Sequence, residues 1–267
     1  MTRLRTLWTG GQLSLNGWCS IGNAFVAEIM AAQGFDSVTV DMQHGALDYS
    51  DLLPMLQAMR ANGATLLARV PWLDPAQVMK ALDAGAEGII CPMVNTADEA
   101  ALLVSFMRYP PLGIRSFGPT RAAFAHGAGY AATANDTVLA FAMIETAEGF
   151  ANLDAIVATP GLNGIYVGPN DLALSLSSGR LPPGLDREEP EMLAALQRIA
   201  TACKDKGIIA ALHCATPEYA ARATGWGYRM VTVGGDTRFL AQGAAAAVAG
   251  FRKQVGQGTG PAGPGGY

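Results

Sequence analysis

The stretch VLAFAMIETAEGFANLDAIVATPGLNGIYVGPND, residues 138–171, decides the fold of this chain. Its pattern is strand, helix, strand: the apolar run 138–144 ends in Glu145, and a second apolar run, 164–167, leads to Asp171. Neighbouring strands of a parallel sheet lie about 4.8 Å apart and point the same way, so acids that follow two such strands converge. Two convergent carboxylates indicate a site for a hard metal ion.

The same unit recurs on both sides of this stretch. Apolar strand-like runs alternate with helical patterns, which is typical of successive βαβ units and a parallel sheet. Most runs are continuously apolar, as expected for strands covered on both faces. We expect strands at residues 16–20, 37–40, 65–69, 88–91, 138–144, 164–167, 208–213 and 230–233. Eight such units predict an α/β fold, a (β/α)8 TIM barrel whose active site lies at the carboxyl ends of the strands.

Helices between these strands have recognisable ends. One helix is predicted over residues 146–159, and another is expected to run to about residue 62. Hydroxyl or acidic residues stand where an N-cap is needed, in two cases directly before a proline and in one case as part of a capping box. The predicted N-caps are Asp48, Asp74, Thr96 and Thr216.

Length and composition predict one domain. The 267 residues match the size of a single α/β barrel, and the composition of 50% hydrophobic and 15% charged residues indicates an extensive core. We expect one barrel domain over residues 1–255 and a disordered Gly/Pro-rich tail over residues 256–267. The irregular segment 108–136 is rich in Gly, Pro, Arg and aromatic residues, which is typical of a lid or an interface.

Charge and hydropathy exclude several kinds of partner. The formal net charge of −4, with only four lysines, argues against a nucleic-acid partner. No segment approaches the roughly 18 apolar residues that span a membrane, and the first residues lack the apolar region of a signal peptide. We therefore expect a cytoplasmic protein with no membrane partner. The four cysteines have no CxxC spacing and are interpreted as buried free thiols.

Glu145 and Asp171 are the strongest candidates for metal ligands. Each could instead cap the start of a helix, since acids favour helix amino ends. Nitrogen and sulfur ligands are scarce near them, so oxygen coordination of Mg²⁺ or Mn²⁺ is the expectation, with Co²⁺ as an alternative. Substrate and water would complete the coordination.

His44 follows the second predicted strand in the segment DMQHG. A histidine at a strand end suits a general base near neutral pH, and the alternative is a structural hydrogen-bonding role. His126 in the irregular segment and His213 in a predicted strand are interpreted as structural or peripheral.

Arg69 ends the apolar run TLLAR. A guanidinium at the mouth of a barrel could bind a substrate carboxylate or a developing oxyanion, and the alternative is a salt bridge to a neighbouring aspartate. The lysines fall within or at the ends of predicted helices and none ends a strand, which argues against a Schiff-base aldolase.

Taken in order, several segments resemble the metal-dependent class II pyruvate aldolases of the 4-hydroxy-2-oxoheptanedioate aldolase type. The resemblance covers about residues 16–251, and its carriers are GFDSVTVDMQHG, RVPWLDPAQVMKALDAGAEGIICPMVNTADEA, RYPPLGIRSFG, MIETAEGFANLDAI and GIYVGPNDLALSL. It implies aldol chemistry between a small 2-oxo acid, pyruvate or hydroxypyruvate, and an aldehyde. It also implies a homo-hexamer in which the last helix packs on a neighbouring subunit.

The resemblance assigns roles to single residues. It implies that Glu145 and Asp171 hold the divalent metal, that His44 is the base, and that Arg69 stabilises the enolate. Asp83 is implied to raise the basicity of that histidine, a role that rests on the resemblance alone. The substrate-binding positions are Arg69, Met143, Gly168 and Asn170, the last through a backbone contact to the substrate carboxylate.

Two positions depart from the pattern of many relatives. Gln43 stands where they have Glu, and Met143 stands where they have Gln. A thioether cannot hydrogen-bond the substrate as an amide would. Two other functions therefore stay open at this point: an acyl-CoA ester lyase of the citrate lyase group, and a barrel that binds a 2-oxo acid without turnover.

Overall fold

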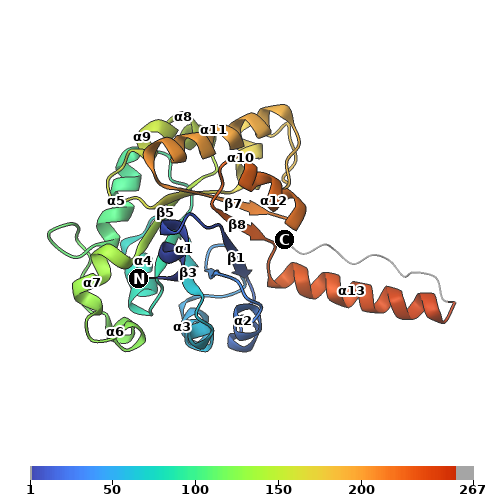
Figure 1. The fold of residues 1–267 in the computed structure, drawn as a ribbon, viewed down its shortest axis with the longest axis horizontal. Helices are drawn as coiled ribbons and strands as arrows, with labels where there is room; N and C mark the ends of the chain where they lie inside the picture. Colours follow the sequence, from blue (N-terminus) through green and yellow to red (C-terminus); the bar gives the residue numbers. More distant parts are fainter. Residues whose placement is uncertain (1, 257–267) are drawn as a thin grey trace.

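The computed structural model describes residues 2–256 and shows a closed barrel of eight parallel strands (Figure 1). The strands follow one another around the barrel in chain order, and β1 closes it by pairing with β8. This arrangement confirms the predicted (β/α)8 fold. The strands are β1 (Ser14–Cys19), β2 (Ser37–Asp41), β3 (Thr65–Arg69), β4 (Gly88–Cys91), β5 (Leu139–Ile144), β6 (Gly164–Val167), β7 (Ile209–Cys214) and β8 (Met230–Val233).

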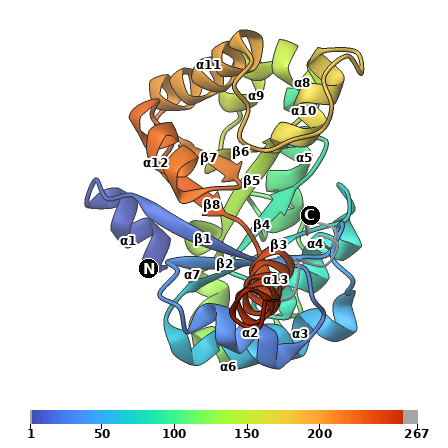
Figure 2. The ribbon, with the colours of Figure 1, turned by 90° about the vertical axis from the view of Figure 1, so that its right-hand side faces the viewer.

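Helices connect the strands and surround the barrel, as Figure 2 shows. The four predicted N-caps are confirmed, because each side chain accepts a backbone N–H of its helix. Within residues 2–256 the α-helices are α1 (Arg3–Thr9), α2 (Ala24–Ala31), α3 (Tyr49–Met59), α4 (Pro75–Asp83), α5 (Ala97–Met107), α6 (Thr120–His126), α7 (Tyr130–Thr137), α8 (Ala147–Ala151), α9 (Leu153–Val157), α10 (Pro169–Leu176), α11 (Pro190–Lys206), α12 (Pro217–Gly225) and α13 (Asp236–Gln254).

The strands are buried on both faces, which explains their continuous apolar runs. One set of side chains fills the barrel interior, and the other packs between the strands and the helices. Large side chains such as Phe141 and Tyr166 occupy the interior cluster.

Three local features differ from the sequence-based expectation. The helix predicted over residues 146–159 is divided into α8 and α9 at Asn152, whose Nδ2 donates to the carbonyl oxygen of Asn95 at 2.8 Å. The segment 108–136 contains most of two short helices, α6 and α7. The short helix α1 was not predicted, and its Leu4 is fully buried in the interior cluster.

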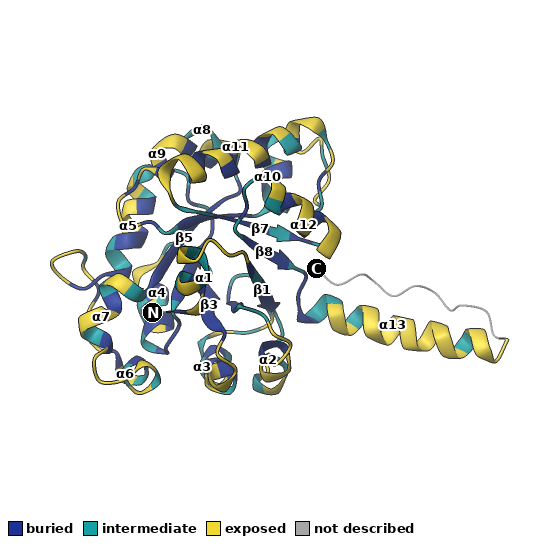
Figure 3. Ribbon diagram, in the orientation of Figure 1, coloured by how far each residue is buried: buried dark blue, intermediate teal, exposed yellow. Residues whose placement is uncertain are grey.

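Helix α13 projects away from the barrel (Figure 1), and Figure 2 views it nearly end-on. Asp236, at its start, is its one buried residue, and Figure 3 shows the rest as largely exposed. The predicted tail lies outside the described residues except for Gly256. None of the helices between residues 2 and 256 is both long and apolar enough to cross a membrane.

Candidate active site

A small cavity opens at the carboxyl ends of the strands. Its wall is built from the ends of β3, β5, β6 and β7 and from the start of α10. Polar or charged residues of the wall include Arg69, Glu145, Tyr166, Asn170, Asp171 and His213.

Glu145 and Asp171 both line this cavity, so the structure brings the two predicted acids together. β5 and β6 pair with Ile144 opposite Val167, and the residues that follow these strands are therefore neighbours. Glu145 follows β5 directly, and Asp171 lies in the first turn of α10. The convergence expected from two adjacent parallel strands is thus present.

The electrostatics of Glu145 favour a bound cation. The residue is only 2% exposed, and its Oε1 accepts the N–H of Met93 at 2.7 Å. Burial, together with the negative charge of Asp171, raises the pKa of Glu145 to about 7, although the Met93 hydrogen bond and the charge of Arg69 act in the opposite direction. A positive counter-charge would remove this cost of ionisation. The donor set therefore fits a divalent cation.

Gly168 leaves room for the Glu145 carboxylate. A Cβ added at Gly168 would lie 2.6 Å from Glu145 Oε2 and 3.0 Å from Met143 Cε. We expect Gly168→Ala to displace the carboxylate and to weaken Mn²⁺ binding about tenfold or more, measured by calorimetry. The matched control is Gly225→Ala, because a Cβ there has no heavy atom within 4 Å. Equal affinities in the two variants would contradict this role.

Arg69 is held by Asp41, so the predicted alternative of a salt bridge is present. Arg69 Nε and Nη2 donate to the two carboxylate oxygens of Asp41 at 2.8 and 2.6 Å, and Asp41 is fully buried. Burial alone would raise the pKa of Asp41, but the hydrogen bonds and charge of Arg69 lower it below its ordinary value. Within residues 2–256, Arg69 Nη1 makes no hydrogen bond and is not fully buried. This nitrogen remains available to a ligand.

His44 lies in a tight turn beside the cavity. Asp41 Oδ1 accepts the backbone N–H of Gln43 at 3.1 Å and of His44 at 3.3 Å. A Cβ at position 45 would collide with the carbonyl oxygen of Asp41, so the turn requires glycine there. His44 lines a groove that shares Asn170 and Asp171 with the cavity of Glu145. The predicted base therefore lies in a groove next to the cavity of the predicted metal acids, and Asp171 lines both.

The start of α10 and the side chain of Met143 complete the wall. Gly168 is the N-cap of α10 and provides no side-chain hydrogen bond. The positive end of the helix dipole, at Asn170 and Asp171, therefore points to the cavity and suits an anion. Met143 is buried in the wall and presents an apolar thioether at its position.

Comparison with known proteins shows which family this chain belongs to. A family model described as HpcH/HpaI aldolase/citrate lyase matches residues 16–243. The chain belongs to this family. A hydroxypyruvate/pyruvate aldolase of Rhizorhabdus wittichii is 39% identical over 252 residues, which cover 94% of this chain and 99% of the relative. A 4-hydroxy-2-oxo-heptane-1,7-dioate aldolase of Salmonella dublin is 33% identical over 244 residues, with coverages of 90% and 91%.

A solved structure of the same family gives the same fold. The HpcH/HpaI aldolase/citrate lyase family protein of Burkholderia cenocepacia has a TM-score of 0.86 and 31% identity to this chain, with coverages of 93% of this chain and 98% of that protein. The family resemblance inferred from the sequence segments is therefore confirmed.

In this HpcH/HpaI family chain, Asp83 lies away from the cavity. It ends α4, which runs back from the carboxyl end of β3 toward the amino end of β4. Its Oδ1 accepts a hydrogen bond from Arg115 Nη2 at 2.6 Å. A five-residue strand is about 16 Å long, so the two ends of the barrel are well separated. Within one protomer, Asp83 and His44 therefore lie near opposite ends of the barrel and are not in contact.

Sequence reasoning gave no chemical role to several residues of the wall. Met93 donates its backbone N–H to Glu145 and adopts a positive φ of 56°, which is uncommon for a residue other than glycine. Tyr166 and His213 also line the cavity. The sequence signal for Tyr166 and His213 was their place near the carboxyl end of a strand. A backbone contact such as that of Met93 leaves no such signal.

Proposed function

We propose that this protein is a class II aldolase that joins pyruvate or hydroxypyruvate reversibly to an aldehyde, with a divalent cation as cofactor. The proposal rests chiefly on one observation: the same cavity, at the carboxyl ends of the strands, is lined by Glu145, Asp171 and Arg69. Relatives that are 39% and 33% identical and are named as aldolases support it.

Glu145 and Asp171 would hold the cation. Their oxygen ligands favour Mg²⁺ or Mn²⁺, with Co²⁺ as the alternative. No group of three or more His, Cys, Asp or Glu residues placed to bind a metal is found among residues 2–256, so substrate and water would complete the coordination. When bound, the cation polarises the carbonyl group of the 2-oxo acid and so acidifies the C3 protons.

The residues of the chain bind the acid and move a proton. The amino end of α10, at Asn170, would bind the substrate carboxylate. His44 would remove a proton from C3, and Arg69 Nη1 would donate a hydrogen bond to the enolate oxygen. C3 of the enolate then attacks the aldehyde carbon, and the proton held by His44 goes to the new alkoxide. Cleavage runs through the same steps in reverse.

The proton-transfer step can be tested without an aldehyde. We expect His44→Ala to slow the exchange of pyruvate C3 protons with D₂O about a hundredfold or more, measured by NMR on the Mg²⁺-loaded protein. His126→Ala is the control, because His126 is an exposed residue outside the cavity. Unchanged exchange in His44→Ala would refute its role as the base.

The aldol step needs its own experiment. The Mg²⁺-loaded protein would be incubated with pyruvate or hydroxypyruvate and a panel of aldehydes, and the products would be identified by mass. A product whose mass equals the sum of acid and aldehyde is the expected result. Binding of the acids with no product from any aldehyde would instead favour a non-catalytic 2-oxo acid binding barrel.

An acyl-CoA ester lyase has less support. That function needs basic groups for the phosphates of CoA, and the segment 108–136 contains three arginines. Arg108 is 4% exposed, and its Nη2 donates to the carbonyl oxygen of Gly161 and to Asn163 Oδ1. Arg115 is 3% exposed and is paired with Asp83, while Arg121 donates to the carbonyl oxygen of Ala84. These side chains are thus engaged within the chain.

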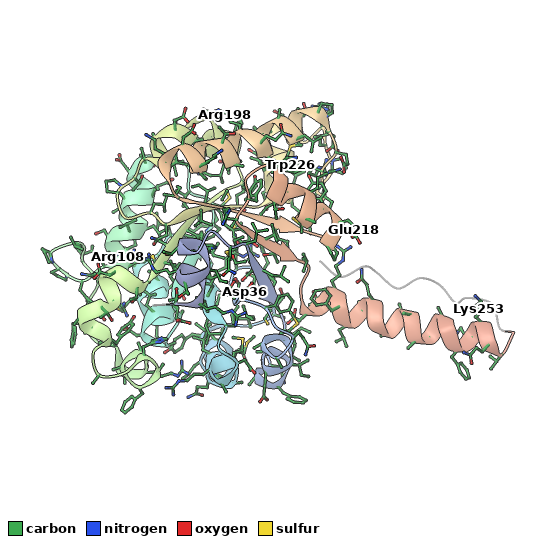
Figure 4. All side chains as sticks on the ribbon, in the orientation of Figure 1. Asp36, Arg108, Arg198, Glu218, Trp226 and Lys253 are labelled. Carbon is green, nitrogen blue, oxygen red and sulfur yellow. The ribbon has the colours of Figure 1, made fainter. Side chains whose placement is uncertain are left out.

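We propose further that α13 packs on a neighbouring copy in a homo-hexamer. Leu240, Val248 and Phe251 on this helix are exposed, and Figure 4 places Lys253 at its far end, away from the barrel. A helix with unburied apolar residues gains stability by packing. Assembly would also be needed for Asp83 to raise the basicity of a catalytic histidine, because Asp83 could then approach only the His44 of a neighbouring copy. Sedimentation of the protein as a monomer at micromolar concentration would contradict this assembly.

A further inference from the structure

His213 lies in the cavity wall, although its sequence position suggested a structural or peripheral residue. It is the fifth residue of β7. Its ring forms a T-shaped pair with Trp18, with 4.8 Å between centroids, and the guanidinium of Arg69 lies 4.9 Å from the Trp18 ring centroid. The imidazole thus belongs to the same part of the wall as the arginine proposed to bind the enolate.

A chain of hydrogen bonds fixes one edge of the His213 ring. Nδ1 lies 3.0 Å from Tyr166 Oη, which lies 2.7 Å from Thr232 Oγ1. Asn16 Nδ2 donates to Thr232 Oγ1 at 3.0 Å, and Asn16 Oδ1 accepts from two hydroxyl groups of β2. All of these partners lie inside the barrel, so the ring has a defined orientation.

The other ring nitrogen, Nε2, is available to a ligand. Among residues 2–256 no hydrogen bond to Nε2 is found, and this atom is not one of the fully buried polar atoms without a partner. Burial lowers the pKa of His213 to about 3, and the charge of Arg69 acts in the same direction. The ring is therefore neutral at physiological pH, and Nε2 either donates or accepts according to the tautomer.

A hydroxyl group is the ligand that suits both tautomers, because it can donate and accept. The neighbouring wall offers such a hydroxyl few other hydrogen-bond partners. Tyr166 Oη is already engaged by Thr232 and His213, and Met143 and Leu185 are apolar. In the proposed function the carboxylate and the keto oxygen of a 2-oxo acid have other partners, at the start of α10 and at Arg69. An uncharged hydroxyl is therefore the substituent that His213 fits.

We propose that His213 is a specificity-determining residue whose Nε2 forms a hydrogen bond with a hydroxyl group on C3 of the 2-oxo acid. The inference rests on the proposed aldolase function and narrows it, because the preferred donor is then a 3-hydroxy-2-oxo acid such as hydroxypyruvate. Pyruvate has no such hydroxyl and leaves Nε2 without this partner, which weakens binding.

Calorimetric titration of the Mg²⁺-loaded protein with each acid tests this role. The unaltered protein is expected to bind hydroxypyruvate about tenfold more tightly than pyruvate, and His213→Leu to bind the two acids equally. His213→Gln keeps a polar end and should retain part of the preference. His126→Leu, which removes a histidine outside the cavity, should leave the preference unchanged.

A preference that survives in a folded His213→Leu protein would overturn the inference. So would equal affinities in the unaltered protein, a comparison that stays decisive if His213→Leu does not fold. Because binding is measured without turnover, failure to form any aldol product would count against the proposed function and not against the role of His213.

Discussion

Replacing Glu145 by glutamine is expected to abolish tight binding of divalent cations and to lower kcat/KM for aldol addition about a thousandfold or more. Glutamine has nearly the same shape and can still accept the N–H of Met93, but it has no negative charge. Calorimetry with Mn²⁺ and initial rates with pyruvate and an aldehyde give the two measurements. Glu148→Gln is the matched control, because Glu148 is exposed on α8.

The same substitution should stabilise the metal-free protein. Burial and the charge of Asp171 raise the pKa of Glu145 in the folded protein from 4.5 to about 7. The protonated side chain therefore contributes its full share to the stability of the fold below pH 4.5, and this contribution is lost as the pH rises through 7. Glutamine does not ionise, so Glu145→Gln avoids this loss. Its free energy of unfolding should exceed that of the unaltered metal-free protein by on the order of 2 kcal/mol at pH 8 and by much less at pH 5. Thermal unfolding of both proteins in EDTA at the two pH values tests whether the substitution stabilises the fold. Lower stability at pH 8 would contradict it.

Replacing Arg69 by methionine is expected to destabilise the fold by about 3 to 5 kcal/mol, because it leaves the buried carboxylate of Asp41 without its positively charged partner. It should also lower the aldol rate about a hundredfold or more through loss of the donor to the enolate oxygen. Urea unfolding measures the first effect, and initial rates measure the second. A variant as stable as the unaltered protein would refute the first effect.

The double variant Asp41→Asn with Arg69→Met separates these two effects. The introduced amide has no charge to leave unpaired, and its oxygen can still accept from the N–H groups of residues 43 and 44. Stability should therefore recover in part, whereas activity should not. Recovery of activity together with stability would show that Arg69 acts only as a structural partner of Asp41.

The barrel was predictable because local signals and the global fold agree. Continuous apolar runs locate strands that are buried on both faces, and capping residues such as Asp74 and Thr96 locate the helix starts. Strand boundaries moved by only one or two residues, as in β1, which begins at Ser14 rather than residue 16. The break at Asn152 was not predicted: its side chain donates to the carbonyl oxygen of Asn95, and a contact with a residue so distant in the sequence leaves no local signal.

The site was predictable as far as topology determines it. Glu145, Asp171 and Arg69 share one cavity because each lies at or just beyond the carboxyl end of a strand. Sequence could not show that Arg69 forms a salt bridge and also keeps a donor for a ligand. Two of its nitrogens donate to Asp41, and the third makes no hydrogen bond within residues 2–256. Nor could it show which face of β7 carries His213, since apolar residues surround this position in the chain.

The most direct test of the account is an anomalous difference map from crystals grown with Mn²⁺. The account predicts a peak within coordination distance of carboxylate oxygens of both Glu145 and Asp171, in the cavity that adjoins His44. A Mn²⁺ peak elsewhere, with neither carboxylate coordinating a metal, would contradict it.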